Sequence, residues 1–178
     1  MAKTETAAAP KKNGESTAAK LKRWILTGTS HMIPFIVAGG ILYSLAVMLN
    51  PLGASEPTEG WLAGLALIGK GGLTLFVPIL GGYIAYAIAD KPGLAPGMIG
   101  AWLASQVGAG FLGGMVAGLL AGWVVYELKK IKLPTSLKTL GAIFLYPLVG
   151  TLIVGLLIVF VVGTPVAAAM SWLTNWLS

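Results

Sequence analysis

An uncharged run of 35 residues most constrains the fold of this chain. From Pro92 to Tyr126 there is no Asp, Glu, Lys or Arg. A helix that crosses a membrane needs about 20 predominantly apolar residues, so the run is typical of a membrane protein. Across the chain 56% of residues are hydrophobic and 10% are charged, whereas ordinary soluble domains carry about 25% charged residues. The sequence therefore predicts an all-α polytopic protein embedded in a lipid bilayer.

The length of this run predicts more than one helix. A single helix of 35 residues would be about 52 Å long, whereas the hydrocarbon core of a bilayer is about 30 Å thick. We therefore expect two spans, Leu94–Val107 and Phe111–Tyr126, joined by a short turn at residues 108–110. Both spans are short, and a re-entrant hairpin is the alternative interpretation.

Glycines recur within the run at helical spacing. Gly110, Gly114, Gly118 and Gly122 are four residues apart, which places them on one face of a helix. Small residues allow helix backbones to approach closely in lipid, where the hydrophobic effect does not drive helices together. We predict that these four glycines form a helix-packing face.

Three further apolar runs are predicted to cross the membrane, which gives about five transmembrane helices. They are Trp24–Leu49, Leu73–Ala89 and Leu140–Val162. Residues 61–69 are also apolar but too few to cross. Because Lys70-Gly71-Gly72 follows them, we expect an interfacial or re-entrant segment there.

Proline and glycine are expected to interrupt these helices. Pro78 and Gly81-Gly82 predict a kink or partial unwinding of the second span. Residues 90–96 are expected to form a tight turn, and Gly163-Thr164-Pro165 is expected to end the last span. Residues 166–177 then predict a short interfacial helix with two tryptophans, Trp172 and Trp176, on one face.

The positive charges are concentrated in two segments. Residues 1–23 carry six Lys or Arg and are predicted to be a disordered, basic cytoplasmic tail, with a helical turn near Ala18–Arg23 as an open alternative. Residues 24–178 are predicted to be the membrane domain. Residues 127–138 carry four lysines, whereas residues 51–60 carry none. Because cytoplasmic loops are enriched in Lys and Arg, the N-terminus is predicted to be cytoplasmic.

The composition argues against several classes of function. The net charge of +6 is explained by membrane topology, so no nucleic-acid partner is expected. The chain has no cysteine and one histidine, which argues against metal sites and cysteine nucleophiles. It also contains no GxxxxGK[ST] phosphate-binding loop. We therefore predict no metal site, no cofactor and no catalytic residue.

Three stretches resemble the membrane (IIC) component of bacterial fructose-type phosphotransferase-system (PTS) permeases. They are GTSHMIPFIVAGG from Gly28, GYIAYAIADKPGLAPGMIGAWLA from Gly82 with the following GAGFLGG, and KLPTSLKTLGAIFLYPLVGTLIVGLLIVFVVGTPVA from Lys132. The resemblance runs from about Trp24 to the C-terminus and covers only the N-terminal half of the family's IIC domain.

This resemblance implies a membrane subunit in the bacterial inner membrane that moves fructose or a related hexose. The IIB component, supplied with phosphate by IIA, would phosphorylate the sugar at the cytoplasmic face. The family's sugar-contacting acidic motif lies in the C-terminal half, so that half is an expected partner and this chain is expected to be incomplete alone. The N-terminal half of related transporters builds much of the subunit interface, which suggests a homodimer. The alternative is a non-transport scaffold or regulatory protein, or a truncated remnant.

A few polar residues are candidates for function. His31, the only residue of a type that titrates near neutral pH, is a candidate for the substrate path, as are Lys70 and Gln106. Asp90 and Lys91 are candidates for IIB docking, because the resemblance puts their loop on the cytoplasmic side. Structural roles compete in each case: an interfacial histidine, a snorkelling lysine, a backbone-bonded glutamine, and an Asp-Lys pair that binds itself or caps a helix.

Overall fold

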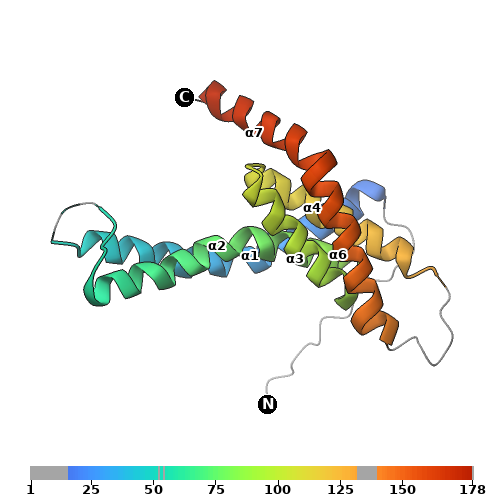
Figure 1. Ribbon diagram of the computed structural model, residues 1–178, viewed down its shortest axis with the longest axis horizontal. Coiled ribbons are helices and arrows are strands. Elements are labelled where there is room, and N and C mark those ends of the chain that lie inside the picture. The colour runs from blue at the N-terminus through green and yellow to red at the C-terminus, as the bar shows by residue number, and fades with distance from the viewer. Residues whose placement is uncertain (1–15, 52, 54, 132–139, 178) are drawn as a thin grey trace, which may run out of the picture.

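The fold is a bundle of helices joined by short connections (Figure 1). The computed structural model describes residues 16–51, 53, 55–131 and 140–177, and no β-strand occurs among them. Helices α1 (Thr17–Met48) and α2 (Gly60–Ala89) form a long antiparallel hairpin, which extends to the left in Figure 1 beyond the other helices. The predicted all-α polytopic architecture is confirmed.

Helix α1 begins earlier than the sequence predicted. The side chain of Ser16 accepts a hydrogen bond from the backbone N–H of Ala19 at 3.3 Å, which caps the first turn. Residues 17–23 are therefore helical and continuous with the first span, which agrees with the helical turn left open at residues 18–23 and not with disorder there. Residues 1–15 of that predicted tail lie outside the described residues.

Helix α2 is continuous from Gly60 to Ala89, so the interfacial or re-entrant segment predicted at residues 61–69 is wrong. The glycines taken as a helix break are instead packing positions. A Cβ atom added to Gly72 would lie 2.8 Å from the Cα of Gly39 in α1, and one added to Gly39 would lie 2.7 Å from the carbonyl oxygen of Gly69. Small residues here permit close contact between the two backbones.

Pro78 and Gly81-Gly82 do not interrupt α2, so the partial unwinding predicted there does not occur. This part of α2 is fully packed. A Cβ atom on Gly81 would lie 2.8 Å from the carbonyl oxygen of Gly97 and 2.9 Å from that of Gly114. Neighbouring helices thus hold the segment on more than one side.

Helices α3 (Lys91–Gln106) and α4 (Gly110–Leu128) form the predicted hairpin. Its turn contains Gly108 and Gly110, whose φ angles of 80° and 53° suit glycine. Helix α3 begins directly after Asp90, so the tight turn predicted to reach residue 96 is wrong. Pro92 lies in the first turn of α3, where its missing N–H costs little.

The last part of the chain is helical from Gly141 to Leu177. Helix α6 (Tyr146–Leu157) is flanked by π-helical turns, η2 (Gly141–Leu145) and η3 (Ile158–Val162), and α7 (Gly163–Leu177) follows at once. The last candidate span ends at Val162, as predicted. The helix that follows begins at Gly163 rather than at residue 166, and Figure 1 shows that it bends away from α6. Lys132 and Lys138, counted in the predicted basic loop, lie outside the described residues.

Four helical segments are long and apolar enough to cross a membrane: α1, α2, α4 and Ile143–Val162. Helix α3 has 16 residues, about 24 Å, which is less than the hydrocarbon thickness. It packs against α2, α4 and α6. The core between these helices consists mainly of alanine and valine, among them Ala85, Ala101, Ala117 and Val154.

Candidate functional site

His31 lies on α1 and stacks on an aromatic ring of α2. The ring centroids of His31 and Tyr83 are 3.9 Å apart, with 11° between the ring planes. Nδ1 of His31 lies 2.7 Å from the carbonyl oxygen of Thr27, and a carbonyl oxygen can only accept, so Nδ1 carries the proton in this contact.

Tyr83 and Tyr86 extend the contact along α2. Their ring centroids are 6.0 Å apart and tilted by 54°. His31 is exposed, and Tyr86 is 38% exposed. Hydroxyl and imidazole groups therefore share one outer face of the α1–α2 hairpin. Sequence reasoning selected His31 but missed both tyrosines, whose i, i+3 spacing on α2 was the available signal.

Lys70 is held by a residue from the connection between α1 and α2. Its Nζ lies 2.5 Å from Oε1 and 2.6 Å from Oε2 of Glu56, and both side chains are partly exposed. The sequence had shown this lysine as an isolated charge between two apolar runs. Tyr83 is thirteen positions after Lys70 in α2, so about 20 Å of helix divides this ion pair from the His31 stack.

Gln106 ends α3 and is exposed. Its neighbour Ser105 donates a hydrogen bond to the carbonyl oxygen of Ala101 at 3.0 Å. His31, Lys70 and Gln106 thus lie on three different helices or helix ends. Three cavities among the described residues, at Tyr43, at Trp24 and at Gly40, are lined by none of these candidates.

Asp90 joins α2 to α3 and contacts the end of α4. Its φ of 58° is the one positive value among the described non-glycine residues. Nζ of Lys129 lies 3.0 Å from Oδ2 of Asp90 and donates to the carbonyl oxygen of Ala89 at 3.2 Å. Lys129 therefore donates both to a carbonyl oxygen in the last turn of α2 and to the carboxylate of Asp90. No side-chain cap from Asp90 starts α3, and its ion pair is with Lys129 rather than Lys91.

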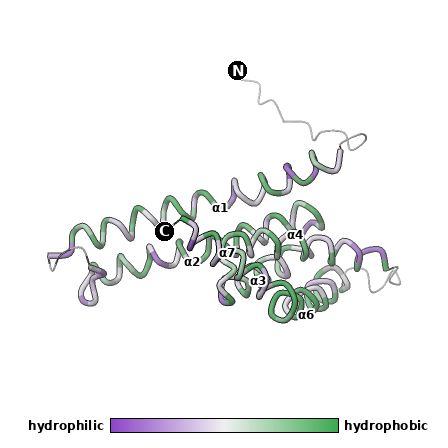
Figure 2. The backbone as a smooth tube through the Cα atoms, turned by 90° about the horizontal axis from the view of Figure 1, so that it is seen from above, coloured by the Kyte–Doolittle hydropathy of each residue, from purple (hydrophilic) through white to green (hydrophobic). Residues whose placement is uncertain are grey.

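More charge gathers at the same end of the bundle. Lys130 donates a hydrogen bond to Glu127 at 2.6 Å, which raises the pKa of Lys130 above its ordinary value. Figure 2 shows hydrophilic residues at the beginning of α1 and at the end of α4, on the same side of the molecule. Among the described residues no group of three His, Asp or Glu side chains could hold a metal ion.

Comparison with known proteins assigns the chain. A family model described as "Phosphotransferase system, EIIC" matches residues 27–178. This chain belongs to the EIIC family. The match begins within α1 and includes every later helix of the structure, and no solved structure matches the chain.

Several curated relatives of this EIIC chain share much of its sequence. "Fructose-like permease IIC component 2" of Escherichia coli (strain K12) is 46% identical over 158 residues, which cover 88% of this chain and 44% of that protein. The "PTS system fructose-specific EIIABC component" of Bacillus subtilis (strain 168) is 43% identical over 172 residues, 93% of this chain and 27% of that protein. The "Fructose permease IIC component" of Bacillus amyloliquefaciens is 53% identical over 126 residues, 68% of this chain and 41% of that protein. The chain thus spans less than half the length of these relatives.

The EIIC assignment gives the described geometry a context. The chain is a multi-pass membrane protein of this family. The glycines of α4 pack onto α2: Gly118 faces the backbone of Gly81, and Gly122 faces the side chain of Ile88. Gly110, the first of the predicted series, instead begins α4 with a positive φ. Helices α2 and α4 therefore pack closely through glycine, and the polar candidate residues lie outside this packed region.

Proposed function

We propose that this chain is the N-terminal membrane part of a PTS sugar permease that carries fructose or a related hexose into the cell. The family match carries this proposal. The names of three relatives, each at least 43% identical, support fructose or a fructose-like sugar as the substrate. In this proposal the covalent chemistry belongs to IIB, and the membrane part supplies the path.

The packing supports a scaffold role for this part of the permease. Helices α2, α3 and α4 meet through glycine and alanine, with Gly81, Gly97 and Gly118 at backbone contact. Such contacts leave little freedom for the helices to move relative to one another. A rigid body of this kind suits the stationary part of a transporter, against which another part moves.

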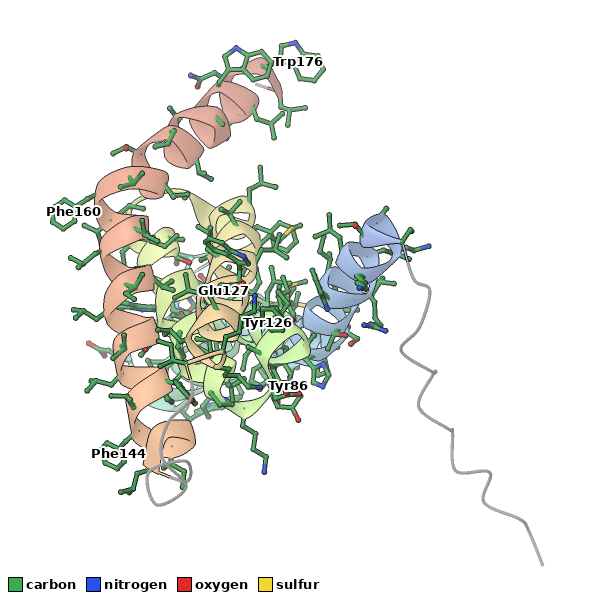
Figure 3. All side chains as sticks on the ribbon, turned by 90° about the vertical axis from the view of Figure 1, so that its right-hand side faces the viewer. Tyr86, Tyr126, Glu127, Phe144, Phe160 and Trp176 are labelled. Atoms are coloured by element: carbon green, nitrogen blue, oxygen red, sulfur yellow. The ribbon has the colours of Figure 1, made fainter. Side chains whose placement is uncertain are left out.

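Two outer faces of the scaffold differ in chemistry. Phe144, Leu148, Leu152, Leu156 and Phe160 are all exposed at a spacing of four residues, and Figure 3 shows Phe144 and Phe160 pointing away from the bundle. We propose that this face contacts lipid. The face with His31, Tyr83 and Tyr86 carries polar groups, which are costly in hydrocarbon. We propose that it faces the rest of the permease and borders the sugar path.

The charge distribution supports a cytoplasmic N-terminus in the inner membrane. Lys20, Lys22, Arg23, Lys91, Lys129 and Lys130 lie at the starts of α1 and α3 and the end of α4. The opposite connection between α1 and α2 carries Glu56 and Glu59. This asymmetry matches the positive-inside rule. We propose that IIB, which is named in fused relatives such as the "PTS system fructose-specific EIIB'BC component" of Xanthomonas campestris, docks at this basic end beside Asp90 and Lys91.

Reconstitution in two parts tests the function. In bacteria that lack every fructose IIC, we expect the 178-residue chain alone to give no phosphoenolpyruvate-dependent fructose accumulation. Co-expression with the C-terminal remainder of a relative's IIC domain is expected to restore it. A lone chain that accumulates fructose contradicts the proposed division of labour. Stable assembly of the two parts without any uptake supports the non-transport scaffold instead.

A further inference from the structure

Asp90, which joins α2 to α3, has a backbone conformation that residues with a side chain rarely adopt. Its φ is 58° and its ψ is −155°, which is close to the region that only glycine populates readily. An aspartate in this conformation destabilises the folded chain relative to a glycine. Residues held in such conformations are concentrated at ligand-binding and active sites. The side chain of Asp90 therefore calls for a reason other than backbone geometry.

The ion pair with Lys129 does not supply that reason. The side chain of Asp90 is 79% exposed, and ion pairs in solvent add little stability. The other contact of Lys129, to the carbonyl oxygen of Ala89, uses only backbone of that turn and does not need a carboxylate at position 90. The ion pair occupies Oδ2 of Asp90, whereas Oδ1 makes no hydrogen bond within the part of the chain that the structure describes. One carboxylate oxygen is thus left for a ligand.

Asp90 opens onto a cavity of about 680 Å³ between the start of α1 and the ends of α2 and α4. Figure 2 shows the beginning of α1 running alongside α4 at this end of the molecule. Small-molecule sites typically have volumes of about 300–1,000 Å³ and combine aromatic walls with a few polar groups. The aromatic and aliphatic walls of this cavity come from Trp24, Trp123, Tyr126, Ile88 and Leu119. Its size and its lining are those of a site for a small molecule.

The cavity continues the face of the α1–α2 hairpin that carries His31 and Tyr83. Trp24 precedes His31 by seven positions in α1, and Asp90 follows Tyr83 by seven positions at the end of α2. Seven residues are nearly two helical turns, so Trp24 and Asp90 lie on the same sides of their helices as the stacked pair. They are about 10 Å nearer the basic end of the molecule. The sugar path proposed beside His31 therefore leads toward this cavity.

We propose that this cavity is a sugar-binding site, which holds a hexose at the cytoplasmic end of the path. This inference rests on the proposed function, because it takes the hexose as the transported molecule. Oδ1 of Asp90 accepts a hydrogen bond from a sugar hydroxyl, and a bond to a charged acceptor is stronger than one between neutral groups. The apolar C–H face of the sugar ring packs on the indole of Trp123, which is 60% exposed.

Sugar binding by the purified 178-residue chain tests this site. The protein is kept in a detergent without a sugar headgroup, and binding is followed by saturation-transfer difference NMR. The panel consists of fructose, glucose, mannose and galactose, with glycerol as a polyol that has no ring. We expect saturable binding of at least one hexose and none of glycerol. Binding of glycerol equal to that of every hexose would overturn the proposal.

Asp90→Gly separates the role of the carboxylate from that of the backbone. Hexose binding should weaken by roughly tenfold or more, because the variant loses a hydrogen bond to a charged group. Its Tm should be unchanged or higher, because glycine adopts a positive φ without strain. If this variant unfolds, Asp90→Asn replaces it, with weaker binding expected because the charge is lost. A folded variant at position 90 that binds the hexose as tightly as the parent protein overturns the proposal.

A pair of tryptophan variants locates the binding. Trp123→Leu removes the ring on which the sugar packs and should weaken binding. Trp102→Leu is the matched control, because Trp102 is 46% exposed on α3 and does not line the cavity. This control should bind the hexose like the parent protein. Equal losses in both variants would mean adsorption to exposed indole rings rather than a site, which contradicts the proposal.

The outcome can be told apart from failure of the proposed function. If the two-part permease accumulates fructose but the chain alone binds no hexose of the panel, the cavity proposal is wrong and the transport proposal stands. If the chain binds a hexose through Asp90 and Trp123 but the two-part permease gives no uptake, the site stands and the transport proposal is wrong. Absence of both binding and uptake overturns both.

Discussion

A Cβ atom on Gly118 of α4 would lie 2.8 Å from the Cα of Gly81 in α2. The obstructing atoms are backbone, including the carbonyl oxygen of Gly81 at 2.7 Å, and backbone cannot rotate away as a side chain can. Gly97 of α3 meets the same stretch of α2, because a Cβ atom added to Gly97 would lie 2.6 Å from that carbonyl oxygen. The crossing of α2, α3 and α4 therefore depends on the absence of side chains at these three positions.

Gly118→Ala is expected to destabilise the protein. The added methyl group has no space beside the backbone of Gly81, and overpacking of this kind typically costs about 1–3 kcal/mol. Gly71→Ala is the matched control, because Gly71 also lies inside a helix but has nothing within 4 Å of an added Cβ atom. Thermal unfolding in detergent should give a lower Tm for Gly118→Ala and an unchanged or higher Tm for Gly71→Ala. Equal Tm values for the two variants would show that the crossing is looser than described.

Gly114→Ala is expected to cost less than Gly118→Ala. The nearest atom to its added Cβ is the side-chain Cγ1 of Val77 at 2.5 Å, whereas the nearest backbone atom is 3.6 Å away. A side chain can adjust more readily than a backbone, so part of the overlap can be relieved. The same thermal measurement ranks the two variants, and a larger loss at Gly114 would contradict this account.

The ion pair between Asp90 and Lys129 is expected to add a small but measurable coupling free energy to the stability of the protein. Both groups lie partly or largely in solvent, with the Asp90 side chain 79% exposed, and exposed pairs are worth about 0–1 kcal/mol. Asp90→Asn is the suitable change because Asn tolerates a positive φ. A double-mutant cycle with Lys129→Gln should give a small coupling free energy that decreases at high salt. A cycle without coupling at low salt would mean that Lys129 acts only through the carbonyl oxygen of Ala89.

His31 can be tested separately for packing and for transport. Aromatic stacking is worth about 0.5–1.5 kcal/mol, so His31→Phe should keep the stability of the protein, and His31→Ala should lower it. If the imidazole borders the sugar path, His31→Phe will reduce fructose uptake by the assembled permease without reducing its Tm. Unchanged uptake in the Phe variant would leave His31 with a packing role alone.

The topology can be read from single cysteines, because the natural chain has none. We expect Ser55→Cys, in the connection between α1 and α2, to react with a membrane-impermeant thiol reagent in intact cells. Ile131→Cys, just after α4, should react only after the cells are permeabilised. The reverse pattern would place the N-terminus outside.

Hydropathy and glycine spacing were enough to predict the membrane class, the α3–α4 hairpin and its turn. Lipid excludes unpaired backbone groups, so apolar length translates directly into helices. The same reasoning was wrong at residues 61–72. There, glycine suggested an interruption, but α2 continues. At Gly69 and Gly72 the reason is contact with Gly39, a residue of another helix that local pattern does not reveal.

The candidate site was likewise predicted only in part from the sequence. By itself the sequence determined which polar residues stand out, because a charge or an imidazole among apolar residues is visible in a single chain. Only the tertiary structure decided their partners: Tyr83 for His31, Glu56 for Lys70, and Lys129, 39 residues away, for Asp90. Such pairs form between helices whose separation and rotation are set by close packing of small residues, and helical periodicity within one segment carries no information about that geometry.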